Sequence, residues 1–403
     1  MKEGWTYKKL GEVCESLNGL WKGKKPPYMN VGVIRNANFT KDFTLNFDNI
    51  EYLDVEEKQY SKRKLRAGDI IVEKSGGSDK QPVGRAVLFD KSEGEYSFSN
   101  FTSVLRIKDQ NEIYSAFLYK YLLYVYLGGA TKKMQKATTG IHNLEFQQYL
   151  NIDVPCIEMG VQQRIVERLD AAFENIDKLK ANAEKQLAEA QTLFQKSLAK
   201  AMKPKEGWEE RLLSEIVHPN CSLSYGIVQP GDHVENGIPV VRPVDFNNQL
   251  YVKMDGLKRT KSEISDAYQR TILKGGEILL CVRGTTGTMG IASDELIGCN
   301  VTRGIVPIYF DVDVCTKFVY YELLSPSLQD EIAHKTTGAA LKQINIKDLR
   351  NLHMSIPPLA EQQRIVERLD ALSENIRKYE EIQRQIISEC DALKQALLRK
   401  VFE

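Results

Sequence analysis

Two segments of the chain repeat hydrophobic residues at helical spacing over about 40 residues. Residues 359–401 contain no proline, and their apolar positions advance in alternating steps of four and three. Such a seam is typical of helices that pair along their length as a coiled coil. A single amphipathic helix lying on a globular domain is the alternative. The positions are Ile365, Leu369, Leu372, Ile376, Tyr379, Gln383, Ile386, Cys390, Leu393 and Leu397.

Residues 160–202 show a similar seam, with glycine only at Gly160 and no proline. A helix of about 43 residues spans roughly 65 Å. The first helix would carry the chain from one domain to the next, so the shortest way to pair the two seams is antiparallel. We therefore expect a pseudo-two-fold (circular) arrangement of two globular domains on two long helices. The first seam has Ile165, Leu169, Ala172, Ile176, Leu179 and Ala183, then shifts phase to Leu187, Ala190, Phe194 and Leu198.

The chain is also an internal repeat. Residues 162–170 and 362–370 are identical, with the sequence QQRIVERLD. Shorter matches follow the same order in both halves, and together they indicate a duplication. They are Lys2-Glu3-Gly4-Trp5 with Lys205-Glu206-Gly207-Trp208, Val33-Ile34-Arg35 with Val240-Val241-Arg242, residues 65–70 with 273–278, Asn100-Phe101-Thr102 with Asn300-Val301-Thr302, and Thr138-Thr139-Gly140 with Thr336-Thr337-Gly338.

The sequences before each long helix predict mixed α/β domains. Short apolar runs such as 69–72 and 277–282 follow glycine turns and are typical of buried strands. Prolines at 155 and 357–358 precede the helices, and Pro204 follows the first one. We predict a first domain over 1–157, a long helix over 158–203, a second domain over 204–357 and a C-terminal helix over 358–403.

Composition narrows the class of protein. Apolar residues make up 42% and charged residues 27%, and no apolar run is long enough to span a membrane. The seven cysteines include no C-x-x-C pair, which favours free thiols over a zinc site or disulfides. The N-terminus has no apolar signal-peptide core, so we expect a cytoplasmic protein. The net charge is +1, with 23 basic and 19 acidic residues in 1–157 (+4) and 16 against 19 in 204–357 (−3), so any DNA contact needs local basic clusters.

Loops, two of them paired between the halves, are the candidates for contact with a nucleic acid such as DNA. Basic and hydroxyl side chains there suit phosphates, while arginine and asparagine can pair with guanine and adenine in the major groove. Solvated loops and a structural histidine are the alternatives. A P-loop motif is absent. The candidates are Lys22, Lys24 and Lys25 beside Trp21; Lys74, Ser75 and Arg85 in the segment 74–85, which aligns from Lys74 with the segment 283–288 that holds Arg283, Thr285 and Thr286; Thr139, His142 and Thr337; and Arg35, Asn36, Arg242 and Arg303.

These motifs resemble the specificity subunit of type I restriction–modification systems. The paired Gly-Trp openings, the T-T-G segments and residues 356–363 (IPPLAEQQ) before the second helix carry the resemblance. The first copy, 154–160, lacks the second proline. The resemblance implies two target recognition domains that each read half of a bipartite double-stranded DNA sequence, with helices that set the gap and dock two methyltransferase subunits. It also implies no catalytic site in this chain, S-adenosylmethionine on the methyltransferase partner, and restriction subunits that use ATP and Mg²⁺.

Two other functions are alternatives to this one. A self-contained DNA methyltransferase would need an N-P-P-Y-type loop and a glycine-rich cofactor site, and I-P-P-L lacks the polar residue of that loop. The E-x-K triplet at 56–58 is a weak nuclease signal. A coiled-coil scaffold without a DNA role would predict no salt-sensitive DNA affinity.

Overall fold

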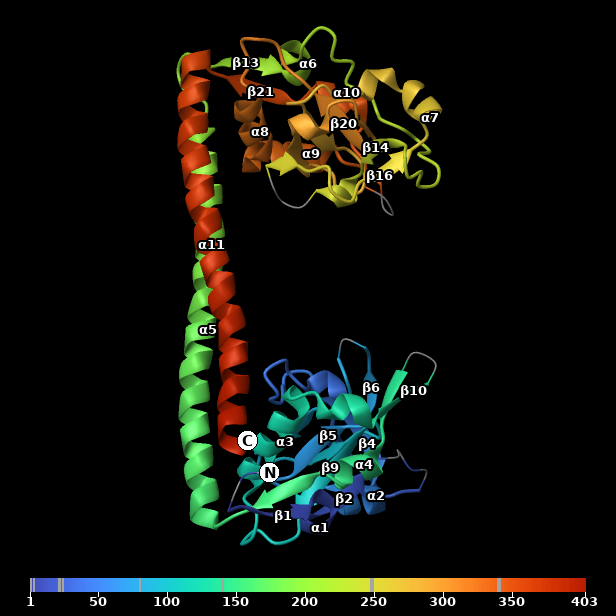
Figure 1. Cartoon of the computed structure of the whole chain (residues 1–403), viewed down its shortest axis with the longest axis vertical. Helices are drawn as coiled ribbons and strands as arrows, with labels where there is room; N and C mark the ends of the chain where they lie inside the picture. The colour runs from blue at the N-terminus through green and yellow to red at the C-terminus, as the bar shows by residue number, and fades with distance from the viewer. Residues whose placement is uncertain are drawn as a thin grey trace. The chain divides into compact units, whose positions relative to one another are not determined.

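The fold is described from a computed structural model of the chain, which covers every residue except 1, 3, 21, 22, 24, 80, 139–140, 247–249 and 339–341. It divides into two compact units, residues 1–184 with 385–403, and residues 185–384. Each unit holds one α/β domain and part of two long helices, α5 (Met159–Ala201) and α11 (Leu359–Phe402) (Figure 1).

The domain of the first unit is built on two small sheets. One has the strand order β2-β9-β5-β7 and is antiparallel, and the other has the order β4-β3-β8, with β3 parallel to β8. Helix α3 (Ser115–Leu127) covers one face of the first sheet. The other elements are β1 (Thr6–Lys9), α1 (Leu10–Val13), β2 (Cys14–Asn18), β3 (Tyr28–Ile34), β4 (Glu51–Glu56), α2 (Glu57–Arg63), β5 (Ile70–Glu73), β6 (Ser75–Gly77), β7 (Ala86–Leu88), β8 (Tyr96–Phe98), β9 (Thr102–Ile107), β10 (Gln135–Thr138), β11 (Ile141–Leu144), α4 (Phe146–Leu150) and β12 (Asp153–Cys156).

The domain of the second unit repeats this plan. Its sheets have the orders β15-β18-β17-β20 and β16-β14-β19. Helix α8 (Thr316–Leu324) packs on the first sheet as α3 does. The remaining elements are β13 (Glu209–Leu212), α6 (Leu213–Ile216), β14 (Ile238–Val241), β15 (Tyr251–Val252), β16 (Lys258–Thr260), α7 (Ser262–Asp266), β17 (Ile278–Cys281), β18 (Met289–Ala292), β19 (Asn300–Val301), β20 (Ile305–Ile308), α9 (Pro326–Lys335), α10 (Ile346–Arg350) and β21 (His353–Ile356).

The central strands are apolar on both faces because both faces are covered. In β5, Ile70 and Val72 pack in the core beneath α3, while Ile71 packs in a separate core between the two sheets. Strand β17 does the same, since Ile278 and Leu280 face α8 and the alternate residues face the other sheet. Successive side chains of a strand point to opposite faces, which explains the uninterrupted apolar runs in the sequence.

The repeated glutamine at the start of each long helix ties that helix to its domain. Gln162 is fully buried, accepts a hydrogen bond from the Tyr114 N–H (2.9 Å) and donates to the carbonyls of Glu112 and Ile157. Gln362 accepts from the Cys315 N–H at 2.7 Å and donates to the carbonyls of Asp313 and Pro357. The identical motif therefore has the same mechanical role in both copies.

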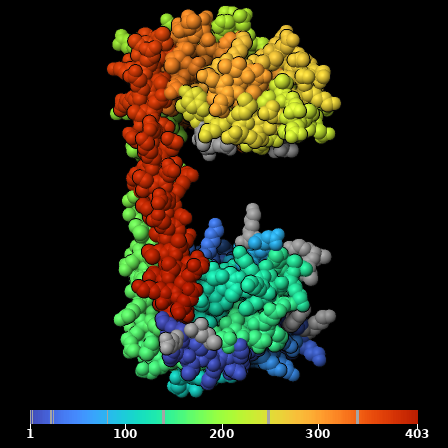
Figure 2. Space-filling model, viewed as in Figure 1, coloured from blue at the N-terminus to red at the C-terminus, as the bar shows by residue number. Residues whose placement is uncertain are grey.

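Helices α5 and α11 pair antiparallel, as predicted, within each unit. In the first unit, Lys180 Nζ lies 2.9 Å from Asp391 Oδ1, and Lys394 pairs with Asp177, so numbers rise along one helix as they fall along the other. In the second unit the Tyr379 hydroxyl donates to Gln186 Oε1 at 2.8 Å. Figure 2 shows the last turns of α11 against the first domain, where Phe402 packs beside Trp5 and α3.

The buried face of the helices differs from the predicted seam. Leu179 and Leu393 were placed in it but are 50% and 48% exposed, and Tyr379 is exposed as well. Each helix packs against a domain as well as against its partner, so the buried row follows both contacts. It includes Val166, Leu169, Phe173, Ile176, Ala183, Ala190 and Leu198 on α5, and Ile365, Val366, Leu369, Gln383, Cys390, Leu398 and Phe402 on α11.

Candidate nucleic-acid interface

Three segments that are distant in the sequence meet at one end of the first domain. They are the 3₁₀ turn Asn36–Asn38, strand β6 after the central strand, and the β10–β11 hairpin. Strand β11 pairs with both β10 and β6. Figure 1 shows β6 and β10 at the end of this domain opposite to α1 and β1. Side chains on these segments are therefore presented together on one surface.

The second domain brings the corresponding segments together. Its 3₁₀ turn is Pro243–Asp245, and Gln343 forms antiparallel bridges with both Arg283 and Thr337. The turn packs against Gly304, just before β20, so closely that a Cβ added to this glycine would lie 2.9 Å from the Pro243 ring. The two domains present the same three-part surface.

The hydrogen bonds fix which residues correspond. The Leu144 N–H donates to the Lys74 carbonyl, as the Ile344 N–H donates to that of Val282. Ser75 therefore corresponds to Arg283, whereas the sequence alignment placed Lys74 there. That alignment was wrong by one residue because glycines and hydroxyl residues on both sides give similar matches.

The strand pairing also corrects the match of residues 100–102 with residues 300–302. Strand β3 pairs Ile34 with Phe98, and β14 pairs Val241 with Val301. Asn100 thus corresponds to Arg303, and the match of residues 100–102 to 300–302 was wrong. Asn300 lies on a buried strand, where it is hydrogen-bonded to Ser265 and Thr271.

In the first domain, polar side chains cluster around the central strand's end. Asn36 Nδ2 donates to the Ser75 carbonyl at 2.5 Å, and its Oδ1 has no hydrogen-bond partner among the described residues. Lys74 Nζ lies 3.1 Å from Asn18 Oδ1 and 5.9 Å from the centre of the Phe146 ring. Partial burial lowers the pKa of the Lys74 ammonium group. This lysine is held on the surface by an amide and a ring rather than by a carboxylate.

The remaining candidates of this domain differ in exposure. Lys25 is exposed. His142 on β11 is mostly buried, with Nε2 at 3.3 Å from Asp79 Oδ1 and no hydrogen-bond partner for Nδ1 in the described part of the chain. The candidates Lys22, Lys24 and Thr139 lie outside the described residues.

Three of the predicted arginines are paired with carboxylates of their own domain. Arg35 pairs with Glu51. Arg85 makes two bonds to the buried Glu73, at 2.8 and 3.1 Å, and lies over the Phe39 ring. Arg242 binds Asp245 at 2.7 and 3.1 Å, and this bond raises the pKa of the guanidinium. These pairs position the 3₁₀ turns and the central strands.

The second domain offers a different set of groups. Arg283 is half-buried and Arg303 is exposed, and neither guanidinium forms an ion pair with the described residues. Thr285 is exposed, and the Thr286 hydroxyl lies 3.4 Å from that of Thr336. Thr337 is exposed at the bridge to Gln343. Two arginines are thus available at this surface, where the first domain has serine and asparagine.

Sequence reasoning missed Val244, the middle residue of the second 3₁₀ turn. Its side chain is 75% exposed beside Arg242, and the corresponding residue of the first domain is Ala37. An exposed branched side chain on this surface could contact a thymine methyl group. The signal was available, because an arginine followed three positions later by Asn38 or Asp245 marks the same capped turn in both copies.

Two features are absent from the described residues. No helix there is apolar and long enough to cross a membrane, and no group of three histidine, cysteine or acidic side chains is arranged to hold a metal ion.

Comparisons with known proteins agree with this duplicated plan. The model of the type I restriction modification DNA specificity domain matches residues 2–189 and again residues 205–387. The EcoBI specificity subunit of Escherichia coli is 25% identical over 323 residues, which cover 74% of this chain and 67% of that protein. The EcoKI specificity subunit of Escherichia coli strain K12 is 22% identical over 437 residues, covering 100% and 89%.

Solved structures show the same fold. A chain from a study of complex assembly and conformational transition in the type I R-M system is 20% identical, with a TM-score of 0.80 and coverage of 100% of this chain and 98% of that one. The HsdS subunit from Thermoanaerobacter tengcongensis is 19% identical, with a TM-score of 0.57 and coverage of 100% and 97%. With two family domains over most of its length, the chain belongs to the specificity subunits of type I restriction–modification systems.

Proposed function

We propose that this chain reads a bipartite double-stranded DNA sequence, with one half-site for each α/β domain, and performs no chemistry itself. The predicted divisions 1–157 and 204–357 would be the two target recognition domains. The proposal rests on one observation: the same three-part surface occurs twice, with different side chains at corresponding positions. Ser75 corresponds to Arg283, and Asn100 to Arg303.

These exchanges change what each surface can recognise. Arg283 and Arg303 would offer guanidinium groups suited to guanine, while the exposed Asn100 would offer an amide suited to adenine. Lysines such as Lys25 and Lys74 would hold phosphates, which adds affinity without sequence preference. Unlike half-sites follow from unlike surfaces on one scaffold.

The long helices would set the distance between half-sites and dock two methyltransferase subunits, to which restriction subunits bind. The exposed apolar residues Leu179 and Leu393 support a docking role, since both lie on the outer face of a helix. S-adenosylmethionine would then be bound by the methyltransferase, and ATP with Mg²⁺ by the restriction subunit, in the cytoplasm. The match to a chain of a type I R-M assembly supports such partners.

A domain exchange tests the proposal directly. Residues 1–157 are replaced by those of a relative, the chain is expressed with its methyltransferase, and adenine methylation is mapped across the host genome. One half of the methylated motif should change and the other should stay. An unchanged motif, or a motif altered in both halves, would contradict the proposal.

A point variant tests the assignment of Arg283. Arg283→Ala should relax the sequence preference at one position of one half-site and cost about 1–3 kcal/mol in binding. Lys25→Ala, as a control for phosphate contact, should weaken binding evenly across sequences and reduce its salt dependence. If Arg283→Ala also weakens all sequences evenly, Arg283 contacts the backbone and not a base.

A further inference from the structure

The first domain contains a buried ion pair, and the second domain has only the acid at the corresponding place. Asp69, just before β5, accepts two hydrogen bonds from the Arg106 guanidinium, at 2.8 and 2.7 Å. Arg106 also donates to the Lys64 carbonyl at 2.9 Å. Both charged side chains are largely buried, so the guanidinium neutralises the carboxylate and fills the space beside it.

The corresponding residues of the second domain are Glu277 and Tyr309. The Ala292 N–H donates to the Glu277 carbonyl as the Phe89 N–H donates to that of Asp69. Ile278 pairs with Ile308 as Ile70 pairs with Leu105, so Tyr309 follows at the place of Arg106. The second domain thus has an acid at the same place and a tyrosine where the first domain has arginine.

Glu277 is left partly unsatisfied. Its side chain accepts from the Lys274 N–H, as Asp69 accepts from that of Arg66, but its Oε2 has no hydrogen-bond partner among the described residues. The residue is only 2% exposed. A buried carboxylate oxygen without a partner is costly, so a donor bound beside it would be favourable.

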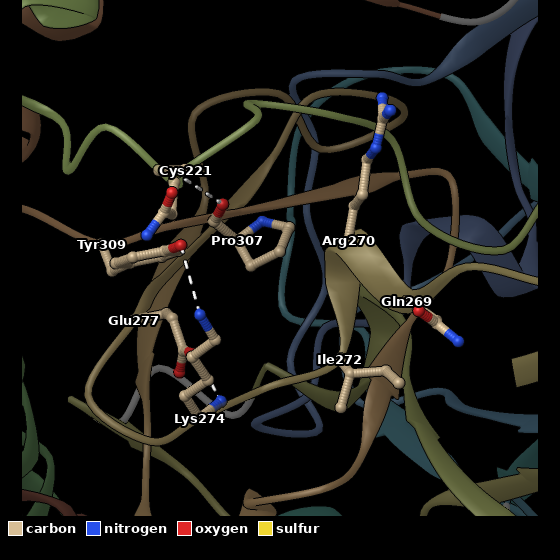
Figure 3. Close-up of a pocket in the computed structure, with 9 residues that line it drawn as sticks. Cys221, Gln269, Arg270, Ile272, Lys274, Glu277, Pro307 and Tyr309 are labelled. Carbon is tan, nitrogen blue, oxygen red and sulfur yellow. Dashed lines mark hydrogen bonds between the residues drawn. The ribbon is translucent and has the colours of Figure 1, made fainter. Parts of the chain in front are cut away.

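A cavity of about 220 Å³ lies at this place in the second domain (Figure 3). Its lining includes Glu277, Tyr309, Lys274 and Ile272, the last of which corresponds to Lys64. Figure 3 shows Glu277, Lys274 and Tyr309 together on one side, while the Arg270 side chain extends away from them. The cavity adjoins the start of β17, whereas Arg283 follows the end of that strand, so it is separate from the proposed DNA surface.

We propose that this cavity binds a guanidinium group, which would pair with Glu277 and stack on Tyr309 as a ligand from outside the domain. The group would supply what Arg106 supplies in the first domain. Planar guanidinium suits both a carboxylate and an aromatic face better than an ammonium ion does. Its source is either a free guanidino compound or an arginine side chain of a protein partner.

The lysine of the cavity lies over the tyrosine ring and is not paired with the acid. Lys274 Nζ lies 4.7 Å from the centre of the Tyr309 ring and 3.3 Å from its hydroxyl, and no salt bridge joins it to Glu277 in the described structure. Lys274 and Arg270 are both exposed at the rim. A bound guanidinium would displace the ammonium group from the ring.

Fluorine NMR of the whole chain, with fluorotyrosine placed only at 309, tests the site. Methylguanidinium chloride should shift the signal saturably, and tetramethylammonium chloride at equal concentration should not. In a parallel arm the chain is assembled with its methyltransferase subunit without the small probe. A shift in the first arm supports a guanidinium site open to free compounds, and a shift only in the second supports a partner's arginine. Glu277→Gln should abolish either shift; a shift that survives it, or no shift in both arms, overturns the proposal.

A second test builds the missing partner into the chain. Tyr309→Arg should raise the melting temperature by a few degrees, because it restores the pair seen in the first domain. The same change in a Glu277→Gln background should give no rise. If Tyr309→Arg lowers the melting temperature equally in both backgrounds, the cavity does not accept a guanidinium beside Glu277.

Discussion

At the scale of the residue, burial decides what a charged side chain does. Glu322 on α8 is almost fully buried, with one oxygen bound by the Ser355 N–H and the other without a partner in the described residues. Burial raises its pKa to about 8, against the opposing effect of that N–H bond. The folded chain therefore keeps a proton that the unfolded chain releases at lower pH.

This sets the sign of a pH dependence. Between about pH 5 and 8 the folded state binds more protons at Glu322 than the unfolded state, so stability should fall as pH rises, by up to about 1.4 kcal/mol per unit. Urea unfolding of Glu322→Gln should lack this component. Glu235→Gln, at an exposed position, is the control and should follow the parent chain. Equal slopes for all three would exclude the assignment.

The pair Arg85–Glu73 leads to a second prediction at this scale. The sequence made Arg85 a candidate for DNA contact, and the structure shows it bound to a buried acid. Arg85→Ala should destabilise the fold by about 3–5 kcal/mol, because a buried carboxylate loses its partner. Cys281 and Thr288 correspond to Glu73 and Arg85, since the same pairing of backbone groups joins them.

The second domain thereby provides a matched control. The double change Glu73→Cys with Arg85→Thr should recover much of the lost stability, since no buried charge remains unpaired. Chemical unfolding of the three chains measures this. A double variant less stable than Arg85→Ala would show that the charge pair itself, and not the unpaired acid, dominates.

At the scale of the element, the spacing of apolar residues along a helix does not determine which of them are buried. The sequence predicted both long helices and their antiparallel pairing, because spacing and length are written in the chain. It placed Leu393 in the seam because a heptad pattern cannot show that the domain covers part of each helix. Likewise, similar residues such as Asn100 and Asn300 suggested an alignment that only the strand pairing corrects. The sequence located the segments of the site. It could not show that Arg35 and Arg85 are paired, because their partners Glu51 and Glu73 are distant in the sequence.

The two leucines of α11 provide the test for this scale. Leu398 is fully buried against the first domain, and Leu393 is half exposed. Leu398→Ala should cost about 2–5 kcal/mol of unfolding free energy, as expected for a buried leucine. Leu393→Ala should cost less than about 1 kcal/mol. Similar losses of unfolding free energy at both positions would show that Leu393 is buried in the helix interface.

At the scale of the whole molecule, the proposed spacer role of the helices relates their length to the gap between the two half-sites. Deleting one heptad from α5 and the facing heptad from α11 removes about 10 Å of helix, which equals about three base pairs. We expect a methylated motif with a shorter gap, or no assembly with the methyltransferase. Methylation mapping distinguishes these outcomes. An unaltered gap with full modification would exclude the helices as the spacer.

The paired exchanges inside the domains also bear on how such a chain can change. A genetic crossover between the two copies at a point within a domain would combine Glu73 with Thr288, or Asp69 with Tyr309. Either combination leaves a buried acid without its arginine. A crossover in the nine identical residues at 162–170 and 362–370 would transfer a whole domain with its internal partners and leave Gln162 or Gln362 in place. New specificities should therefore be inherited as complete cassettes, with the helix starts as the points of exchange.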